Sequence, residues 1–364
     1  MRKKVTITII AVIVLVVLGG IAVWWLMGQP IYVPGMVRSG KNLRGSLAPP
    51  EQTQEGPYWQ VEGDIRLFYH TQGTGRPVLV LHGGPGYPIH HPLAALEPLA
   101  EHYKFYYYDQ RGCGRSTKPF DRFESRNFYT NMKGLERTLG IGAQVADLER
   151  IRQILGQERL VLLGHSFGAF LATMYAAEFP ERVEKLVLVA PSGVLVLPDK
   201  EGGFFELIRG SLPDTQEDEY ERFLKEYLDF GKVFSKSEAE LAKMNRRVGE
   251  FFLEASGEQL IEGDDESADN GGWMVQAMYF SMGQRHDYRP ALRGVQAPVL
   301  VIHGEDDMIP ERVSRMYVQS FPNARLHVVK NGKTRGAGRA GHFLLSDRPE
   351  ELAAILGEFL AEAR

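Results

Sequence analysis

Residues 159–177 read RLVLLGHSFGAFLATMYAA, and three local signals follow one another within them. An apolar run predicts a strand, the pentapeptide GHSFG comes next at 164–168, and a helix-forming stretch comes directly after it. A Gly-x-Ser-x-Gly turn between a strand and a helix is typical of a nucleophile elbow, in which the glycines permit a sharp turn and the serine is exposed at its tip. The stretch therefore indicates acyl-transfer chemistry with Ser166 as the nucleophile.

The same alternation of apolar strands and helices extends along most of the chain. Around Gly63-Asp64, two alternating runs predict a β-hairpin. Near-continuous apolar strands that alternate with helices indicate an α/β fold, with a mostly parallel sheet covered by helices on both faces. The further strands are expected at 77–81, 105–108, 160–163, 186–189, 298–302 and 326–329, and helices at 145–155, 167–178, 312–320 and 349–360.

One interval does not follow this alternation of strands and helices. Residues 195–293 are rich in Glu, Asp, Phe and Tyr, and they show helical spacing at 220–230 and 237–255. Because the strand pattern resumes directly afterwards, we expect a helical cap inserted into one core domain rather than a separate domain. The core is then formed by residues 57–194 and 294–364.

The N-terminus predicts a membrane segment, residues 1–28. Three basic residues precede Val5–Met27, which carries no charge and suffices to span a bilayer as a helix. The positive-inside rule places the N-terminus in the cytoplasm and the catalytic domain outside it. A signal peptide cleaved near Gly20-Ile21-Ala22, giving a secreted protein, is the alternative. Residues 29–56, with several Pro and Gly, are interpreted as a linker that lifts the domain off the membrane.

Composition excludes several other classes of function. The 364 residues are 44% hydrophobic with a formal net charge of −4, and the basic residues are scattered, so no nucleic-acid partner is indicated. Cys113 is the only cysteine, which rules out an internal disulfide, and no Cys/His spacing predicts a metal site. The oligomeric state stays open.

A serine nucleophile needs a base, and the base needs an orienting acid. In strand–elbow–helix architectures the chain order is Ser, acid, His. Asp307, in the acidic turn after the strand at 298–302, is the expected acid, with Asp306 as its competitor. His342, in the loop before the last helix, is the expected base.

The tetrahedral intermediate also needs hydrogen-bond donors for its oxyanion. One donor is expected from the backbone N–H of Phe167, the residue after the nucleophile. The other is expected from the glycine-rich loop HGGPG at 82–86, which follows the strand at 77–81. Gly84 is the first choice there and Gly83 the second, since glycine allows close backbone approach.

Three motifs together carry a family resemblance: HGGPG at 82–86, DQRGCGRS at 109–116 and GHSFG at 164–168. The chain resembles the proline iminopeptidases (prolyl aminopeptidases) of the α/β-hydrolase fold. The resemblance implies release of an N-terminal proline, or a similar small residue, from peptides through an acyl-enzyme. It implies no metal and no organic cofactor.

The substrate is less closely defined than the chemistry. A free α-amine is a cation that a carboxylate would bind, and the cap offers Glu217 and Glu221, with Trp273 as a further candidate. Ala169 stands where the aminopeptidases carry a second glycine after the elbow. A carboxylesterase or lactonase therefore stays open as the alternative, and a non-catalytic receptor on the same fold as a remote one.

Overall fold

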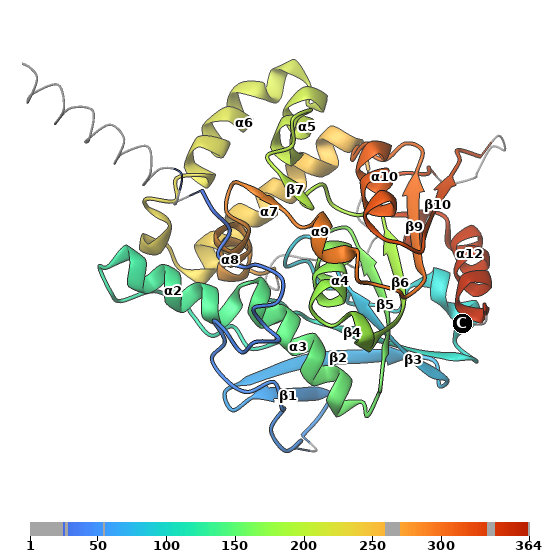
Figure 1. Ribbon diagram of the computed structural model, residues 1–364. Helices are drawn as coiled ribbons and strands as arrows, with labels where there is room; N and C mark the ends of the chain where they lie inside the picture. Colours follow the sequence, from blue (N-terminus) through green and yellow to red (C-terminus); the bar gives the residue numbers. More distant parts are fainter. Residues whose placement is uncertain (1–24, 26–27, 54, 259–269, 333–338, 363–364) are drawn as a thin grey trace, which may run out of the picture.

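The computed structural model describes residues 25, 28–53, 55–258, 270–332 and 339–362. Within them, an eight-stranded sheet has the order β1-β2-β4-β3-β5-β6-β9-β10 (Figure 1). Strand β2 pairs antiparallel with β1 and β4, and the other neighbours are parallel, which confirms the predicted sheet. The strands are Tyr58–Glu62 (β1), Ile65–Gln72 (β2), Arg76–Leu81 (β3), Tyr103–Tyr108 (β4), Leu160–His165 (β5), Val183–Val189 (β6), Val299–Gly304 (β9) and Ala324–Val329 (β10).

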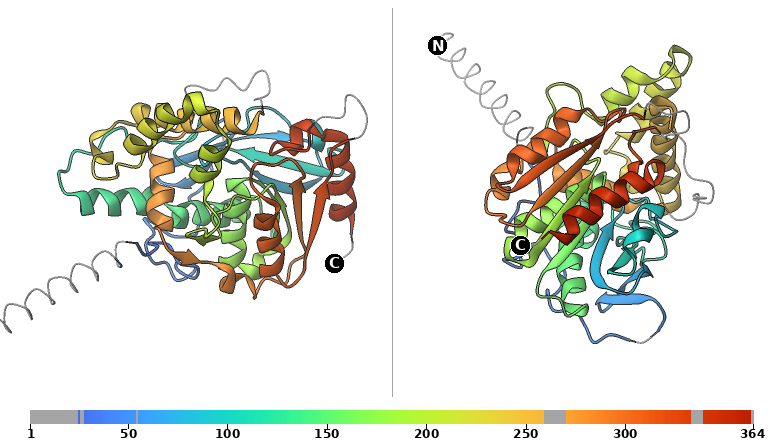
Figure 2. Two further views of the ribbon diagram at one scale, coloured as in Figure 1. Left: turned by 90° about the horizontal axis from the view of Figure 1, so that it is seen from above. Right: turned by 90° about the vertical axis from the view of Figure 1, so that its right-hand side faces the viewer.

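Helices cover both faces of this sheet, as predicted. Because side chains alternate along a strand, Leu162 and Leu188 join one hydrophobic cluster, while their neighbours Leu163 and Val187 join the other. The right-hand view of Figure 2 shows α12 lying across one face of the sheet. The first cluster includes residues of α3 (Ile141–Ile154), α4 (Phe167–Glu178) and α10 (Glu311–Ser320); the second includes residues of η1 (Ala94–Leu99), α11 (Leu344–Asp347) and α12 (Pro349–Ala361).

The insertion between β6 and β9 is helical. In Figure 1, α5, α6 and α7 lie beyond the ends to which the parallel strands point. Val196 pairs with Asp287 and Leu197 with His286, so a short antiparallel ladder joins the two ends of the insertion. The insertion contains β7 (Val196–Leu197), α5 (Phe204–Ser211), α6 (Asp214–Tyr227), η3 (Val233–Ser235), α7 (Glu238–Ser256), α8 (Trp273–Met282), β8 (His286–Asp287) and α9 (Arg289–Leu292).

Helix α2 (Phe128–Leu139) was not among the predicted helices. It begins after Asn127, whose side chain accepts a hydrogen bond from the backbone N–H of Thr130 at 3.0 Å. This is an ordinary N-cap, which satisfies one of the free N–H groups in the first helical turn. Beside α2 runs α8, the last long helix of the insertion (Figure 1).

Residues 29–56 were expected to form a linker that lifts the domain off the membrane, but their described part packs on the domain. Tyr32 and Val37 are fully buried. The buried Glu178 carboxylate accepts hydrogen bonds from the Tyr32 hydroxyl and the Val37 backbone N–H, and Ser46 O accepts from Arg150. A Pro- and Gly-rich composition predicts irregular backbone, but it does not predict whether that backbone packs, since burial depends on distant partners.

The predicted membrane segment lies, apart from Trp25 and Gly28, outside the described residues. Among the helices that the structure describes, none combines the length and apolarity needed to cross a membrane.

Candidate active site

The elbow forms where it was predicted, between β5 and α4. Ser166 has φ 53° and ψ −118°, a left-handed conformation that costs a non-glycine residue about 1–3 kcal/mol. The backbone N–H of Ser166 donates to Val189 O at 3.0 Å, which fixes the turn against β6. The strained turn holds Ser166 at the carboxyl edge of the parallel strands.

The two elbow glycines are required by close approach of other backbone. A Cβ atom on Gly168 would collide with the carbonyl oxygens of Leu81 and His82 at the end of β3. A Cβ atom on Gly164 would lie 2.6 Å from Ala169 N in the first turn of α4. The Gly-x-Ser-x-Gly spacing is therefore a packing requirement between β3, β5 and α4.

The structure brings His342 and Asp307 together. His342 Nδ1 lies 3.1 Å from Asp307 Oδ1 and 3.0 Å from Oδ2, and the Asp307 side chain is fully buried. Asp306, the competitor, is 41% exposed and lies beside Arg339. Of these two neighbouring acids, Asp307 therefore faces the imidazole, and Nε2 of His342 stays available for a second partner.

His342 also lies beside the elbow. His165, the residue before the nucleophile, has Nε2 at 2.9 Å from the His342 carbonyl oxygen, and the two rings are 5.0 Å apart. Burial lowers the pKa of His165 to about 4, so this imidazole is neutral at neutral pH. A neutral His165 can donate from Nε2 to the carbonyl and thereby tie the histidine loop to the elbow.

Glu258, two residues after the end of α7, was not among the predicted site residues. Its carboxylate accepts a hydrogen bond from the His342 backbone N–H at 2.6 Å. Phe252, on α7, packs edge-on against the His342 ring at 5.2 Å. The sequence carried no signal for Glu258, which is one of many acids in an acidic insertion.

Two carboxylates control the charge of His342. Burial of the imidazole disfavours its protonated form, but the charge and hydrogen bond of Asp307, together with the charge of Glu258, outweigh this effect. The pKa of His342 is therefore raised above its usual value of 6.5. A raised pKa makes the neutral imidazole a stronger base.

The glycine-rich loop lies against the nucleophile. A Cβ atom on Gly83 would be 3.0 Å from Ser166 Cβ, so only glycine fits there without displacing its neighbour. Gly84 follows with φ +111°, a conformation that favours glycine. Phe167 is the first residue of α4, so its backbone N–H has no acceptor within the helix. Both predicted donor segments thus flank Ser166.

Residues of the DQRGCGRS motif hold the glycine-rich loop in place through hydrogen bonds to His82. The Gln110 backbone N–H donates to His82 Nε2 at 3.1 Å, and the Gln110 side chain donates to His82 O at 3.0 Å. Cys113 is completely buried, with Sγ 3.5 Å from the same His82 nitrogen. Burial lowers the pKa of His82 to about 4, which keeps it a neutral acceptor.

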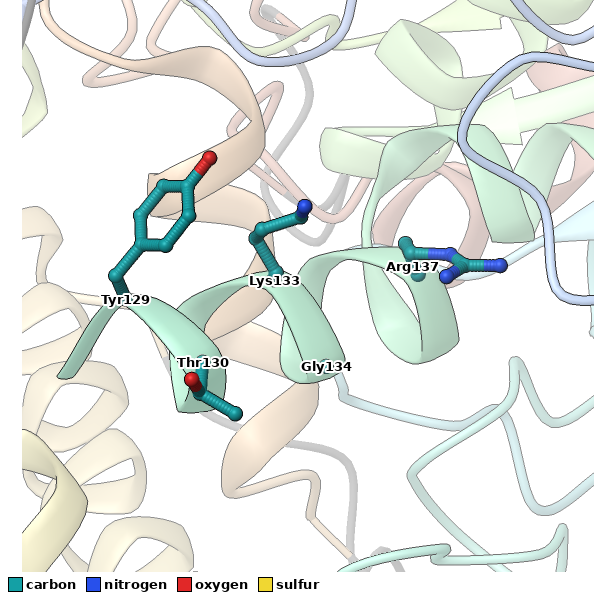
Figure 3. A pocket seen from close by; sticks show the side chains of 5 residues that line it. All are labelled: Tyr129, Thr130, Lys133, Gly134 and Arg137. Carbon is teal, nitrogen blue, oxygen red and sulfur yellow. The ribbon is translucent and has the colours of Figure 1, made fainter. Parts of the chain in front are cut away.

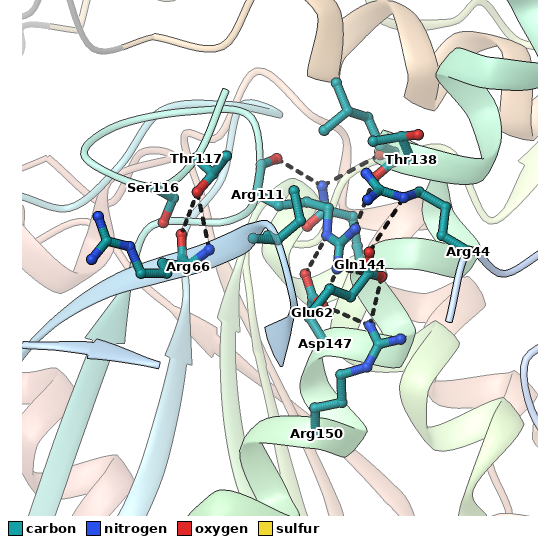
Figure 4. A network of polar contacts seen from close by, with 12 residues as sticks. Arg44, Glu62, Arg66, Arg111, Ser116, Thr117, Thr138, Gln144, Asp147 and Arg150 are labelled. Atoms are coloured by element: carbon teal, nitrogen blue, oxygen red, sulfur yellow. Dashed lines mark hydrogen bonds and ion pairs between the residues drawn. The ribbon is translucent and has the colours of Figure 1, made fainter. Parts of the chain in front are cut away.

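Arg111 of the motif is the centre of a buried ionic network (Figure 4). Its guanidinium group donates to both carboxylate oxygens of Asp147, and Arg150 contacts the same carboxylate at 3.1 Å. Glu62 accepts from both arginines at 3.1 Å. Multiple charge-assisted bonds compensate the burial of these charges and fix the motif to α3 and β1.

The three predicted substrate-binding residues, Trp273, Glu217 and Glu221, form no hydrogen bond, ion pair or ring contact with Ser166, His342 or Asp307. Trp273 is fully buried, and its indole N–H donates to Asp121 O at 2.9 Å. Its ring packs on Phe123 and Phe234, so it offers no surface to a substrate in this structure. Glu217 is exposed on α6, and Glu221 forms an ion pair with Arg209 near the surface.

In the part of the chain that the structure describes, no group of three or more His, Cys, Asp or Glu side chains has the arrangement of a metal site.

Comparison with known proteins gives a consistent superfamily. A family model described as the alpha/beta hydrolase fold matches residues 76–335. A proline iminopeptidase from Heyndrickxia coagulans is 26% identical over 300 residues, which cover 80% of this chain and 93% of the relative. A 2-hydroxymuconate semialdehyde hydrolase from Pseudomonas sp. (strain CF600) is 28% identical over 311 residues, 83% of this chain and 93% of the relative.

Solved structures agree on the fold. An esterase from Exiguobacterium antarcticum superposes with a TM-score of 0.54 at 19% identity, covering 85% of this chain and 100% of the esterase. Proline iminopeptidase from Mycobacterium smegmatis superposes with a TM-score of 0.50 at 22% identity, covering 82% and 95% of the two chains. At such identities the likeness extends to the fold alone.

Proposed function

Because the chain belongs to the alpha/beta hydrolase family, we propose that it is a serine hydrolase with Ser166 as nucleophile, His342 as general base and Asp307 as the orienting acid. The observation that carries this proposal is the strained Ser166 at the tip of the elbow, beside an imidazole whose Nδ1 is held by a buried carboxylate. Nucleophile, base and orienting acid come from three loops at one edge of the sheet, as this chemistry requires.

The reaction runs through an acyl-enzyme. Ser166 Oγ attacks the substrate carbonyl carbon while His342 Nε2 takes the hydroxyl proton. The C–O⁻ of the tetrahedral intermediate accepts hydrogen bonds from the backbone N–H groups of Phe167 and of Gly84, with Gly83 as the competing donor. His342 returns the proton to the leaving amine or alcohol as the bond to it breaks. Water then attacks the ester of Ser166 by the same proton path, and the acid is released.

Asp307 has two effects in this cycle. It holds the proton of neutral His342 on Nδ1, so that Nε2 is the free acceptor, and it stabilises the imidazolium that forms. The raised pKa of His342 follows from the same contact. The Asp307 carboxylate does not need to take up the proton itself.

For the substrate, we favour short peptides with an N-terminal proline or a similar small residue. Proline iminopeptidases recur among the relatives that match 80% or more of this chain. A carboxylesterase or lactonase activity is the second candidate, since matches of similar coverage to 2-hydroxymuconate semialdehyde hydrolases show that the relatives do not share one substrate. A non-catalytic receptor is the remote third, and the intact set of site residues argues against it.

The full chain, purified in detergent, should be offered a proline arylamide, an alanine arylamide and a short-chain aryl ester. Preferential turnover of the proline arylamide is expected. Ester turnover without arylamide turnover would instead establish the esterase function. No turnover of any of the three by folded protein would favour the receptor.

We also propose that residues 1–28 anchor the protein in a membrane, with the N-terminus in the cytoplasm and the catalytic domain outside. The support is the uncharged run Val5–Met27 after three basic residues. Protease added to intact cells should remove the domain if it lies outside. A mature protein that starts near residue 23 would show that the segment is a cleaved signal peptide.

A further inference from the structure

The exposed large apolar side chains belong to three segments that meet near one end of α8. In the described residues, five large apolar side chains are exposed: Trp25, Val33, Phe128, Tyr129 and Leu228. Single exposed apolar residues are normal on a soluble surface, but a contiguous group of them marks an interaction site. Three separate segments contribute to this group, so their proximity is a property of the fold.

The first segment holds Trp25 and Val33. Residues 28–32 run along the end of α8: the Ile31 N–H donates to Ser281 O at 3.0 Å, and the Gln284 N–H donates to Gly28 O at 3.0 Å. These bonds fix the path of the chain as it enters the domain. Trp25 and Val33 flank this fixed stretch on either side.

The other two segments meet the same end of α8. Phe280, in the last turn of α8, has its ring 6.0 Å from Phe128 and 5.6 Å from Phe230. Phe128 begins α2, and Phe230 donates its backbone N–H to Leu228 O at 2.9 Å. The exposed residues of α2 and of the turn after α6 therefore surround the point where the N-terminal segment enters.

Helix α2 adds a polar rim to this surface. Tyr129, Lys133 and Arg137 follow one another at four-residue spacing on one side of α2 and line a shallow hollow (Figure 3). The Tyr129 side chain is 62% exposed, and Lys133 Nζ lies 5.3 Å from the centre of its ring. Tyrosine and tryptophan favour the interface between lipid and water, and lysine can extend its ammonium group towards lipid phosphates.

From these contacts we infer that this surface, formed by Trp25, Val33, Phe128, Tyr129, Lys133 and Leu228 and here called the α2 face, rests on the phospholipid headgroups of the membrane. The inference deepens the proposed anchoring and rests on it. A bilayer is the occupant that the chain itself supplies, because the uncharged run Val5–Met27 ends directly before the fixed stretch at 28–32.

The short connection leaves the domain no freedom to stand away. Tyr32 is 1% exposed and packed in the core, so only the four residues between Met27 and Tyr32 can span any gap. The five Cα-to-Cα steps from Met27 to Tyr32 reach about 17 Å at full extension, and the hydrogen bonds of Gly28 and Ile31 shorten that reach. An anchored domain must therefore lie within headgroup distance, with the α2 face towards the lipid.

The test uses the full chain in phospholipid nanodiscs that contain phosphatidylglycerol. Because Cys113 is fully buried, a nitroxide can be placed on single introduced cysteines without removing it. Tyr129→Cys and Leu228→Cys probe the α2 face, and Glu158→Cys, at a side chain that is 82% exposed in the loop before β5, is the matched aqueous control. Collision of each label with oxygen and with a water-soluble nickel complex is measured by electron paramagnetic resonance.

We expect labels at 129 and 228 to collide more with oxygen and less with nickel than the label at 158. If the protein resists alkaline extraction from membranes but the labels are as accessible to nickel as the control, the lipid contact of the α2 face is refuted and the anchoring by residues 1–28 is not. Release of the unmodified full chain by alkaline extraction would overturn both. Low collision with both reagents would show burial against protein and would also overturn the lipid contact.

A charge variant tests the rim separately. Lys133→Glu should reduce the oxygen collision of the label at 129, because the new carboxylate is repelled by anionic headgroups. Lys104→Glu is the matched control, since Lys104 also lies over a tyrosine ring, at 5.1 Å from Tyr106, but on the sheet. An equal effect of the two variants would contradict a local contact between α2 and lipid.

Discussion

The two sides of the active site are built differently. On the core side, backbone geometry dominates: Ser166 is strained, and Gly83 and Gly168 lie where a Cβ would meet other chain segments. On the cap side, side chains dominate: Phe252 on α7 and Glu258 just after it contact His342. Backbone constraints tolerate few substitutions, whereas side-chain contacts can be exchanged. The core side is therefore held by backbone packing, whereas the cap side contacts the proposed base through side chains that could be exchanged.

Removal of the nucleophile on the core side should have the largest effect on activity. Ser166→Ala should reduce turnover of the preferred substrate by about ten-thousand-fold or more. Stability should change little, because the Ser166 side chain makes no capping hydrogen bond with α4. Steady-state kinetics with a thermal unfolding control measure both. Undiminished turnover would refute the assignment of the elbow.

The next largest effect is expected at the orienting acid. Asp307→Asn should lower kcat by about a thousand- to ten-thousand-fold, since an amide can force His342 into the wrong tautomer. Asp306→Asn is the matched control, because the exposed Asp306 carboxylate should change kcat by about twofold or less. A large loss with Asp306→Asn and none with Asp307→Asn would assign Asp306 as the orienting acid.

Backbone constraint on the core side can be tested through stability. Gly168→Ala should destabilise the protein by about 3 kcal/mol or more, because the new methyl group would collide with Leu81 O. The control is Gly210→Ala on α5, where a Cβ meets nothing within 4 Å and alanine should stabilise the helix by about 0.5–1 kcal/mol. Denaturant unfolding compares them. Similar stability of the two variants would show that the core side is as tolerant as the cap.

The cap side should show smaller, graded effects. Glu258→Ala removes the acceptor for the His342 backbone N–H and should lower kcat by about tenfold. Glu258→Gln keeps an acceptor oxygen and should recover most of that loss. If both variants matched the unmodified protein, Glu258 would have no part in positioning His342.

The pH profile gives the smallest and most specific difference. Because the pKa of His342 is raised, kcat/KM should fall with decreasing pH through a value above 6.5, where the imidazole becomes protonated and can no longer accept a proton. Glu258→Gln removes one of the negative charges that raise this pKa, so the acid limb should move to lower pH. An unshifted limb would mean that Asp307 alone sets the basicity of His342.

The stability that His342 contributes to the fold changes with pH in the opposite direction to catalysis. A histidine whose pKa is higher in the folded than in the unfolded state stabilises the fold below its unfolded pKa. That contribution is lost as pH rises through the folded pKa of His342. Catalysis and this part of stability therefore favour opposite sides of the same titration.

Local sequence patterns predicted most elements of the core and the candidate site. Hydrophobic periodicity predicted β5 and α4 on either side of Ser166, and the chain order of nucleophile, acid and base indicated His342 and the acidic turn with Asp306 and Asp307; the structure places Asp307 against the imidazole. Such signals are readable because strand and helix periods, and the steric demands of a tight turn, are local properties of consecutive residues.

Tertiary structure alone decided which distant residues meet. Glu258 reaches His342 across 84 positions, Trp273 is buried in an aromatic cluster, and Tyr32 of the expected linker enters the core. None of these residues differs in local pattern from others that remain at the surface. Their burial and partners depend on how the insertion and the N-terminal segment pack on the sheet. Composition and periodicity describe only neighbouring residues and therefore do not predict that packing.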